Sequence, residues 1–314
     1  MKSNLAVRVI LQLVTVMPQR QKKNYIGKQN AGWKKCVKIP GDGRARIPMG
    51  TRGNEKERVF VMSEQKETVI TEEKKQTLSV LRNSEEIYML MSACTKMPFV
   101  VCDPETYDDK IFLFNDLETA KKCAEKYRNE NQPVNVGKVG KKQLLPFYSS
   151  LYTMGINCLA FENKEEKRTA IQLEELVKRG DINHLPEGKV WVENPGLHLT
   201  SLYFMQEMRR HKKPELTEEM KELQEEILSN FQRGTYIAAV QEGNKIPLLK
   251  QQDGTSFQPI FTDVIEFQKF NREQKFKSAV IKADKLLNIL VPEAKGVVIN
   301  PFGVNLQLPI KRKK

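Results

Sequence analysis

The order of predicted elements in this chain of 314 residues repeats itself, and this repetition restricts the fold more than any other feature. Residues 97–162 and residues 235–301 each predict a strand, a turn, a second strand, a helix headed by aspartate, a strand, a helix and a final strand. The interval between the two passages is too long for a solenoid repeat, which favours duplication of a whole domain. The predicted fold class is therefore α+β (mixed α/β), built as two tandem copies of a small sheet-and-helix domain.

The alignment of the two passages rests on short matches. KIFLFNDLETAKKC (residues 110–123) lies against FQPIFTDVIEFQKF (residues 257–270), which aligns Asp116 with Asp263. TMGINC lies against GVVINP, which aligns Ile156-Asn157 with Ile299-Asn300. The identity is low, so the shared order of elements carries more of the argument than the matched letters.

The duplication predicts the domain boundaries. Residues 72–180 form the first, degenerate domain, and residues 195–310 form the second. Residues 181–217, which are rich in proline and glycine, hold the joint between the copies and the opening helix of the second. Residues 1–61 precede both domains as a basic leader, which is expected to be disordered or misassigned because residues 18–58 have almost no hydrophobic periodicity.

Individual elements follow from periodicity and caps. A helical stripe is predicted over residues 72–93, and a later helix is expected to end with a cap at Gly180. Thr217 opens a long amphipathic helix. Strands are predicted at residues 97–103, 110–115, 133–139, 155–162, 169–173, 235–241, 245–251, 258–262, 277–282, 296–301 and 303–310, and further helices at 116–127, 141–152, 195–210, 263–273 and 283–293.

The net charge of +13 belongs almost entirely to the leader. Residues 1–61 hold 14 Lys and Arg against 3 Asp and Glu, which is +11, and the remainder holds 38 against 36, which is +2. The leader is interpreted in three ways: as a nucleic-acid-binding arm, as an anchor to an acidic membrane, or as an upstream region misassigned as protein. On the third interpretation translation begins at Met62, since codons for Lys56-Glu57-Arg58 can contain a purine-rich bacterial ribosome-binding sequence.

The expected compartment is the cytoplasm. The chain has no uninterrupted apolar run of the roughly 18 to 20 residues that a membrane span requires. Its five cysteines, an odd number without a C-x-x-C pair, argue against a disulfide framework and against a zinc site.

Motifs that would indicate catalysis fail on inspection. Residues 137–142 (GKVGKK) lack the spacing of a phosphate-binding loop and resemble an RNA-binding GXXG loop only formally. His184, His198 and His211 are scattered, and His198, in an apolar helix, is expected to be a packed residue. The sequence therefore predicts no enzyme, no cofactor and no metal site.

The candidate contact surface comes from residues near strand ends and the linker. Asp116 and Asp263 stand at strand-to-helix junctions, where they serve as helix caps or as part of a binding surface. The turn Asn300-Pro301-Phe302 exposes aromatic and backbone groups after a strand. Trp191, with the apolar stretch at residues 197–205, marks either an interaction surface or packing between the copies.

A family resemblance enters at these motifs. QPIFTDVIEFQKF followed by AKGVVINPFGVNLQL in the second copy, together with NPGLHLTSLYF at its opening, is similar to the SseB (enhanced serine sensitivity) family. The first copy departs from the pattern, with Phe-Asn-Asp in place of Phe-Thr-Asp and with Cys158 in place of the proline. The resemblance implies an SseB-type domain and supplies no catalytic residues.

The function expected from these observations is that of a non-enzymatic cytosolic interaction or regulatory protein with an unidentified protein partner. Two alternatives stay open. One is a sensor that binds a small polar metabolite such as an amino acid at a strand–helix edge or between the domains. The other is nucleic-acid binding through residues 1–61.

Overall fold

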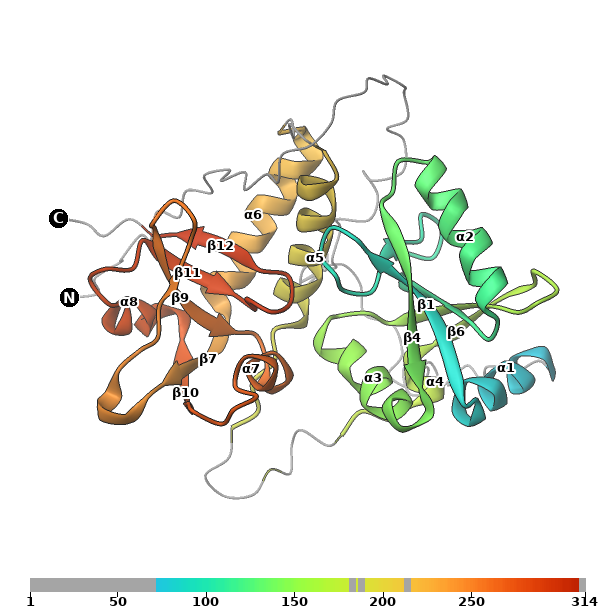
Figure 1. Cartoon of the computed structure of the whole chain (residues 1–314), viewed down its shortest axis with the longest axis horizontal. Helices are drawn as coiled ribbons and strands as arrows, with labels where there is room; N and C mark the ends of the chain where they lie inside the picture. The colour runs from blue at the N-terminus through green and yellow to red at the C-terminus, as the bar shows by residue number, and fades with distance from the viewer. Residues whose placement is uncertain (1–71, 181–184, 186–189, 212–215, 311–314) are drawn as a thin grey trace, which may run out of the picture.

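The computed structural model describes residues 72–180, 185, 190–211 and 216–310 of the chain. Two similar sheet-and-helix halves, each with a six-stranded mixed sheet, give an α+β fold (Figure 1). The expected fold class is thus confirmed. The predictions about residues 1–61 and the start at Met62 fall outside the described residues, as do residues 181–184, 186–189 and 212–215 of the joint.

The first half contains a sheet of strand order β4-β1-β3-β5-β6, with β2 added beside β3. Strands β3 and β5 run parallel, and the other pairs are antiparallel. Its elements are α1 (Glu72–Asn83), β1 (Glu86–Ser92), β2 (Val101–Cys102), β3 (Asp109–Phe114), α2 (Leu117–Asn129), β4 (Val134–Gly140), α3 (Lys141–Thr153), β5 (Cys158–Glu162), β6 (Arg168–Gln172) and α4 (Leu173–Leu176).

The second half contains a sheet of strand order β10-β7-β9-β11-β12, with β8 beside β9 and with β9 and β11 parallel. Two long helices precede this sheet. The elements are α5 (Pro195–Arg210), α6 (Glu218–Arg233), β7 (Thr235–Val240), the 3-10 turn η2 (Glu242–Asn244), β8 (Leu249–Lys250), β9 (Ser256–Phe261), α7 (Val264–Phe270), β10 (Lys277–Lys282), the 3-10 turn η3 (Ala283–Lys285), α8 (Leu286–Ile289), β11 (Gly296–Ile299) and β12 (Leu306–Pro309).

The strand registers test the alignment of the two passages. Tyr88 pairs with Phe114 in the first sheet, and Ile237 pairs with Phe261 in the second, so the alignment of Asp116 with Asp263 agrees with the pairing. The alignment of Ile156-Asn157 with Ile299-Asn300 does not. Asn157 precedes β5 whereas Asn300 follows β11, and these are opposite ends of corresponding strands. A two-letter match between passages of such low identity is too short to determine which residues of the two strands correspond.

Three further predictions needed correction. Residues 72–93 form α1 and then β1, not one helix, because β1 lies inside the sheet and its apolar run does not distinguish strand from helix. The helix expected to end at Gly180 stops at α4, with Val177 as its C-cap. Two predicted strands shrink to two residues each, as β2 and β8.

Helix α5 lies between the two sheets (Figure 1). Leu197, Leu202 and Phe204 are buried in one hydrophobic cluster that also contains core residues of both sheets. The side chain of Gln206 is buried and forms two hydrogen bonds with the backbone of Val100, accepting at 3.2 Å and donating at 3.1 Å. The two halves therefore share a core through this helix.

Cys94, Cys123 and Cys158 are free thiols, and burial raises the pKa of Cys158 to about 11. In the part of the chain that the structure describes, no helix combines the length and apolarity needed to cross a membrane.

The two hydrogen bonds between the Gln206 side chain and the Val100 backbone link the halves, and their contribution to stability can be tested. Gln206→Ala leaves a buried amide and a buried carbonyl of Val100 without partners, so we expect a loss of about 2–3 kcal/mol in unfolding free energy. Urea denaturation followed by circular dichroism measures the loss. Gln232→Ala, on an exposed position of α6, is the matched control and is expected to change stability by less than about 0.5 kcal/mol. Equal effects of the two variants would show that the hydrogen bonds between Gln206 and Val100 contribute nothing to the unfolding free energy.

Candidate functional site

The turn after β11 is stabilised by the hydrogen bonds of a buried asparagine. Asn300 is fully buried and adopts a positive φ of 48°. Its Oδ1 accepts from the amide of Thr262 at 3.0 Å, and its Nδ2 donates to the Thr262 hydroxyl at 2.7 Å. Its carbonyl accepts from the amides of Gly303 at 2.8 Å and Asn305 at 2.9 Å. The conformation of the turn is therefore set by hydrogen bonds that water does not reach.

This turn presents a large aromatic side chain. Phe302 is 62% exposed, although its ring lies against that of Phe270 with centroids 5.8 Å apart. Phe270 in turn contacts Phe276, with centroids 5.1 Å apart. We call Phe276, Phe270 and Phe302 the aromatic row; its members run from the start of β10 across the end of α7 to the turn.

Asp263 lies directly beside Thr262 and caps α7. Its Oδ1 accepts from the amides of Ile265 at 2.9 Å and Glu266 at 3.0 Å, and its Oδ2 accepts from the Thr262 hydroxyl at 2.8 Å. The side chain is only 1% exposed. The expectation of a helix cap is confirmed, and the cap is joined through Thr262 to Asn300.

A buried histidine and a second carboxylate complete this polar cluster. His198 of α5 is fully buried, with Nδ1 3.7 Å from Asp263 Oδ2 and Nε2 4.0 Å from Glu266 Oε1. Glu266 also forms an ion pair with Lys269. A Cβ atom at Gly303 would lie 2.5 Å from Glu266 Oε2, so the turn passes close over this carboxylate. We call His198, Thr262, Asp263, Glu266 and Asn300 the buried polar cluster.

The charge state of Asp263 follows from its neighbours. Burial acts to raise the pKa of its carboxyl, because desolvation disfavours the charged form. Attraction to His198 and the hydrogen bond from the Glu266 amide outweigh burial, and the pKa of Asp263 is held below its ordinary value. Asp263 is accordingly a carboxylate at neutral pH, which suits a cap and offers no proton for acid catalysis.

Part of the buried polar cluster could not be predicted from the sequence. His198 was expected to be a packed residue, and its burial confirms that, yet its neighbours were not foreseen. Glu266 stands three residues after the cap Asp263, and this D-x-x-E spacing is the available signal. Nothing in the local sequence indicates that a histidine of α5 lies beside Asp263 and Glu266.

Asp116 occupies the corresponding junction of the first half in a different environment. It caps α2 by accepting from the amide and the hydroxyl of Thr119, both at 3.0 Å. Its side chain is 23% exposed and lies 3.6 Å from Lys164. The aspartate cap is therefore partly exposed to water in the first half and buried in the second.

The other predicted residues lie apart from the buried polar cluster. Trp191 is 44% exposed, so it does not pack in the core as one interpretation held, whereas most of residues 197–205 are buried. Pro301 is half-buried beside Phe302. His211 follows α5 as an exposed residue, and His184 lies outside the described residues. Residues 137–142 belong to β4 and the first turn of α3, so they do not form a GXXG loop between helices.

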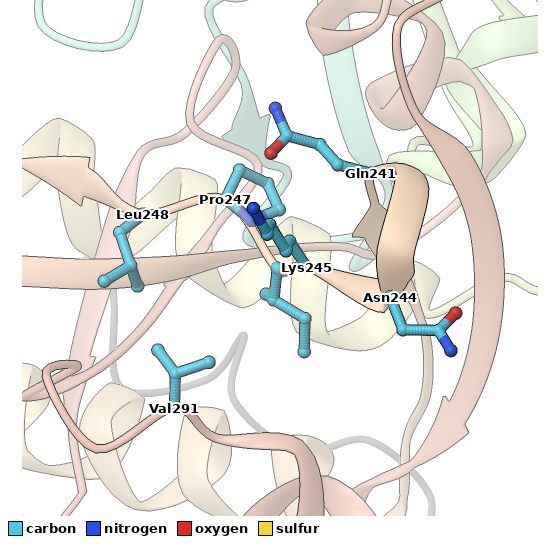
Figure 2. A pocket seen from close by; sticks show the side chains of 7 residues that line it. Gln241, Asn244, Lys245, Pro247, Leu248 and Val291 are labelled. Carbon is cyan, nitrogen blue, oxygen red and sulfur yellow. The ribbon is translucent and has the colours of Figure 1, made fainter.

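A shallow hollow lies at the β7–β8 connection, with a volume of about 600 Å³. Figure 2 shows the side chains of Leu248 and Val291 pointing toward each other from two different segments. Gln241, Asn244 and Lys245 supply polar groups at its rim. Among the described residues, no group of three or more His, Cys, Asp or Glu is placed to hold a metal ion.

Comparisons with known proteins add little to this picture. No family model matches the chain, and no curated protein matches it significantly. It is similar to the solved structure of Tic22 from Plasmodium falciparum, with 13% identity, coverage of 71% of this chain and 90% of that chain, and a TM-score of 0.19. It is also similar to Anabaena Tic22 (protein transport), with 12% identity, coverage of 68% and 84%, and a TM-score of 0.19. At such scores neither similarity carries an argument about this chain.

The two aspartate caps make a matched pair of variants. Asp263→Ala removes a dry cap and leaves Thr262 and His198 without their buried partner, so we expect a loss of about 3 kcal/mol in unfolding free energy. Asp116→Ala removes only a cap that water can replace, and a distinctly smaller loss is expected. Urea denaturation measures both. If Asp116→Ala were the more destabilising variant, the buried polar cluster would not make the contribution to stability that is assigned to it.

Proposed function

We propose that this chain is a non-enzymatic interaction or regulatory protein, of the SseB type that its second half resembles, and that it binds a protein partner through Phe302. The observation that carries the proposal is an exposed aromatic ring on a turn whose conformation is set by buried hydrogen bonds. A cytoplasmic location belongs to the same proposal.

The energetics of such a surface favour binding. A side chain held in place before association loses little conformational freedom on binding, so more of the contact energy appears as affinity. Aromatic residues are also enriched among the few positions that dominate protein–protein affinity. Phe302 rests on Phe270 and presents more than half of its surface, which leaves a face for a partner to cover.

Recovery of a partner by the tagged full-length chain tests this proposal. We expect purification from the native cytosol, at moderate salt and with nuclease, to yield one stoichiometric protein. Phe302→Ala is expected to reduce its recovery about thirtyfold, as for loss of a residue that dominates an interface. Leu145→Ala, which truncates an exposed apolar side chain of α3 in the first half, is the matched control and should recover the partner normally. Unchanged recovery with Phe302→Ala, or no partner at all, would refute the proposal.

The hollow beside β8 favours a second candidate, a sensor of a small polar metabolite. Its apolar floor and the ammonium group of Lys245 at the rim suit a small molecule with a carboxylate, such as an amino acid. L-Serine at 100 times its Kd should raise stability by about 2.7 kcal/mol, seen as a higher Tm in a thermal shift assay. Lys245→Gln should abolish the shift. An unchanged Tm of the wild-type protein over a millimolar series of amino acids would eliminate this candidate.

Nucleic-acid binding through residues 1–61 rests on charge alone, since these residues lie outside the described part of the chain. Affinity for DNA or RNA that falls steeply with salt, and disappears when residues 1–61 are removed, would support it.

A further inference from the structure

Strand β10 forms the open edge of the second sheet. It stands at the end of the strand order, and among the described elements β7 alone makes an extensive contact with it. Ser278, Ala279 and Val280 at its centre are exposed, and Val280 is 47% exposed. Figure 1 shows β10 at the margin of the second half, away from the first. An edge of this kind offers unpaired backbone groups to an added strand.

The pairing with β7 determines which backbone groups of β10 face outward. The amide of Ala283 donates to the carbonyl of Gly234 at 3.0 Å, and the register continues from this pair as Lys282 opposite Thr235. In an antiparallel pair, residues alternate between bonding the neighbouring strand and facing away from it. Residues 281, 279 and 277 therefore bond β7, whereas the amides and carbonyls of residues 278, 280 and 282 face outward.

The corresponding edge of the first sheet is protected. The register places Lys138 of β4 opposite Tyr88 and Val280 of β10 opposite Ile237, and these two partners correspond in the two sheets. Lys138 is ion-paired with Glu86, so β4 carries a charged side chain at the centre of its edge, a common protection against strand addition.

Helix length adds to this difference between the two edges. Helix α2 has 13 residues and reaches β4, whereas α7 has seven and covers β7 and β9 but not β10. The centre of β10 is thus uncovered as well as uncharged.

Charge selects the occupant of this edge. Residues 275–285 contain four lysines and one aspartate. Lys277 and Lys282, at the two ends of β10, are exposed and form no ion pair with any described residue. Pairing of two copies of the chain through β10 would bring two such lysine-rich segments together, which like-charge repulsion opposes. An added strand with acidic residues at its ends meets complementary charge instead.

We propose that β10 binds an extended acidic segment of a partner protein by strand addition, with Lys277 and Lys282 contacting carboxylates and Val280 contacting an apolar side chain between them. Backbone groups of residues 278, 280 and 282 supply the hydrogen bonds of the new ladder. This inference goes beyond binding through Phe302, because it rests on the backbone of β10 and needs no contribution from the aromatic row.

A fluorescein-labelled peptide, Glu-Asp-Thr-Val-Thr-Val-Thr-Asp-Glu, tests the proposal by fluorescence anisotropy with the full chain. We expect binding with a Kd below about 1 mM at low salt, weakening as salt is raised. Val280→Pro removes an outward amide while the pairing with β7 is kept, and should weaken binding about tenfold or more. Val280→Lys, which gives β10 the residue that β4 carries, should do the same and covers the case in which proline disturbs the fold.

Controls separate strand addition from simple charge attraction and from the Phe302 proposal. Lys138→Pro in β4 and Phe302→Ala should bind the peptide as the wild type does. Lys277→Glu combined with Lys282→Glu should weaken binding of the acidic peptide and strengthen binding of a basic peptide of the same length. In hydrogen–deuterium exchange, the amides of Ser278, Val280 and Lys282 should exchange fast in the free chain and become protected by the peptide. No binding by the wild type, or binding by both Val280 variants as tight as that of the wild type, would overturn the proposal.

Discussion

Helix α5 is buried along most of its length between two sheets, and several of its polar side chains are paired by one half or the other. Gln206 and Tyr203 are paired by the first half, through the backbone of Val100 and the carboxyl of Asp109. His198 faces the second half, against Asp263. Arg209 reaches both, because its guanidinium donates to the carbonyl of Cys94 and to that of Val304. The placement of the two halves depends on this one helix.

The same dependence explains the character of the turn that presents Phe302. Asn194, just before α5, donates to the carbonyls of Thr235 and Thr262, which fixes the start of the helix against the ends of β7 and β9. His198, one turn later, then lies against the cap of α7. Because this cap is buried and joined to Asn300 through Thr262, the turn after β11 is stabilised by hydrogen bonds inside the protein. Among the residues that the structure describes, no such helix covers Asp116, and this junction stays partly exposed to water.

Two sheets with the same strand order thus carry different surfaces. Shortening of one helix, from 13 residues in α2 to seven in α7, uncovers an edge strand in the second half. A charged residue at the centre of β4 is replaced in β10 by Val280. These are small changes in sequence with a large effect on what the surface can bind, because an edge strand exposes a full row of backbone hydrogen-bonding groups.

The sequence by itself determined the α+β class, the twofold order of elements and the caps at Asp116, Asp263 and Thr217, since these depend on local periodicity and on hydrogen bonds within one turn. It also singled out the Asn300–Phe302 turn. Local pattern could not separate β1 from α1, because a strand inside a sheet is apolar on both faces as a buried helix is. Only the tertiary structure brought His198 to Asp263 and left β10 uncovered. Both results depend on how segments distant in the chain pack together, and such packing produces no periodic pattern in the local sequence.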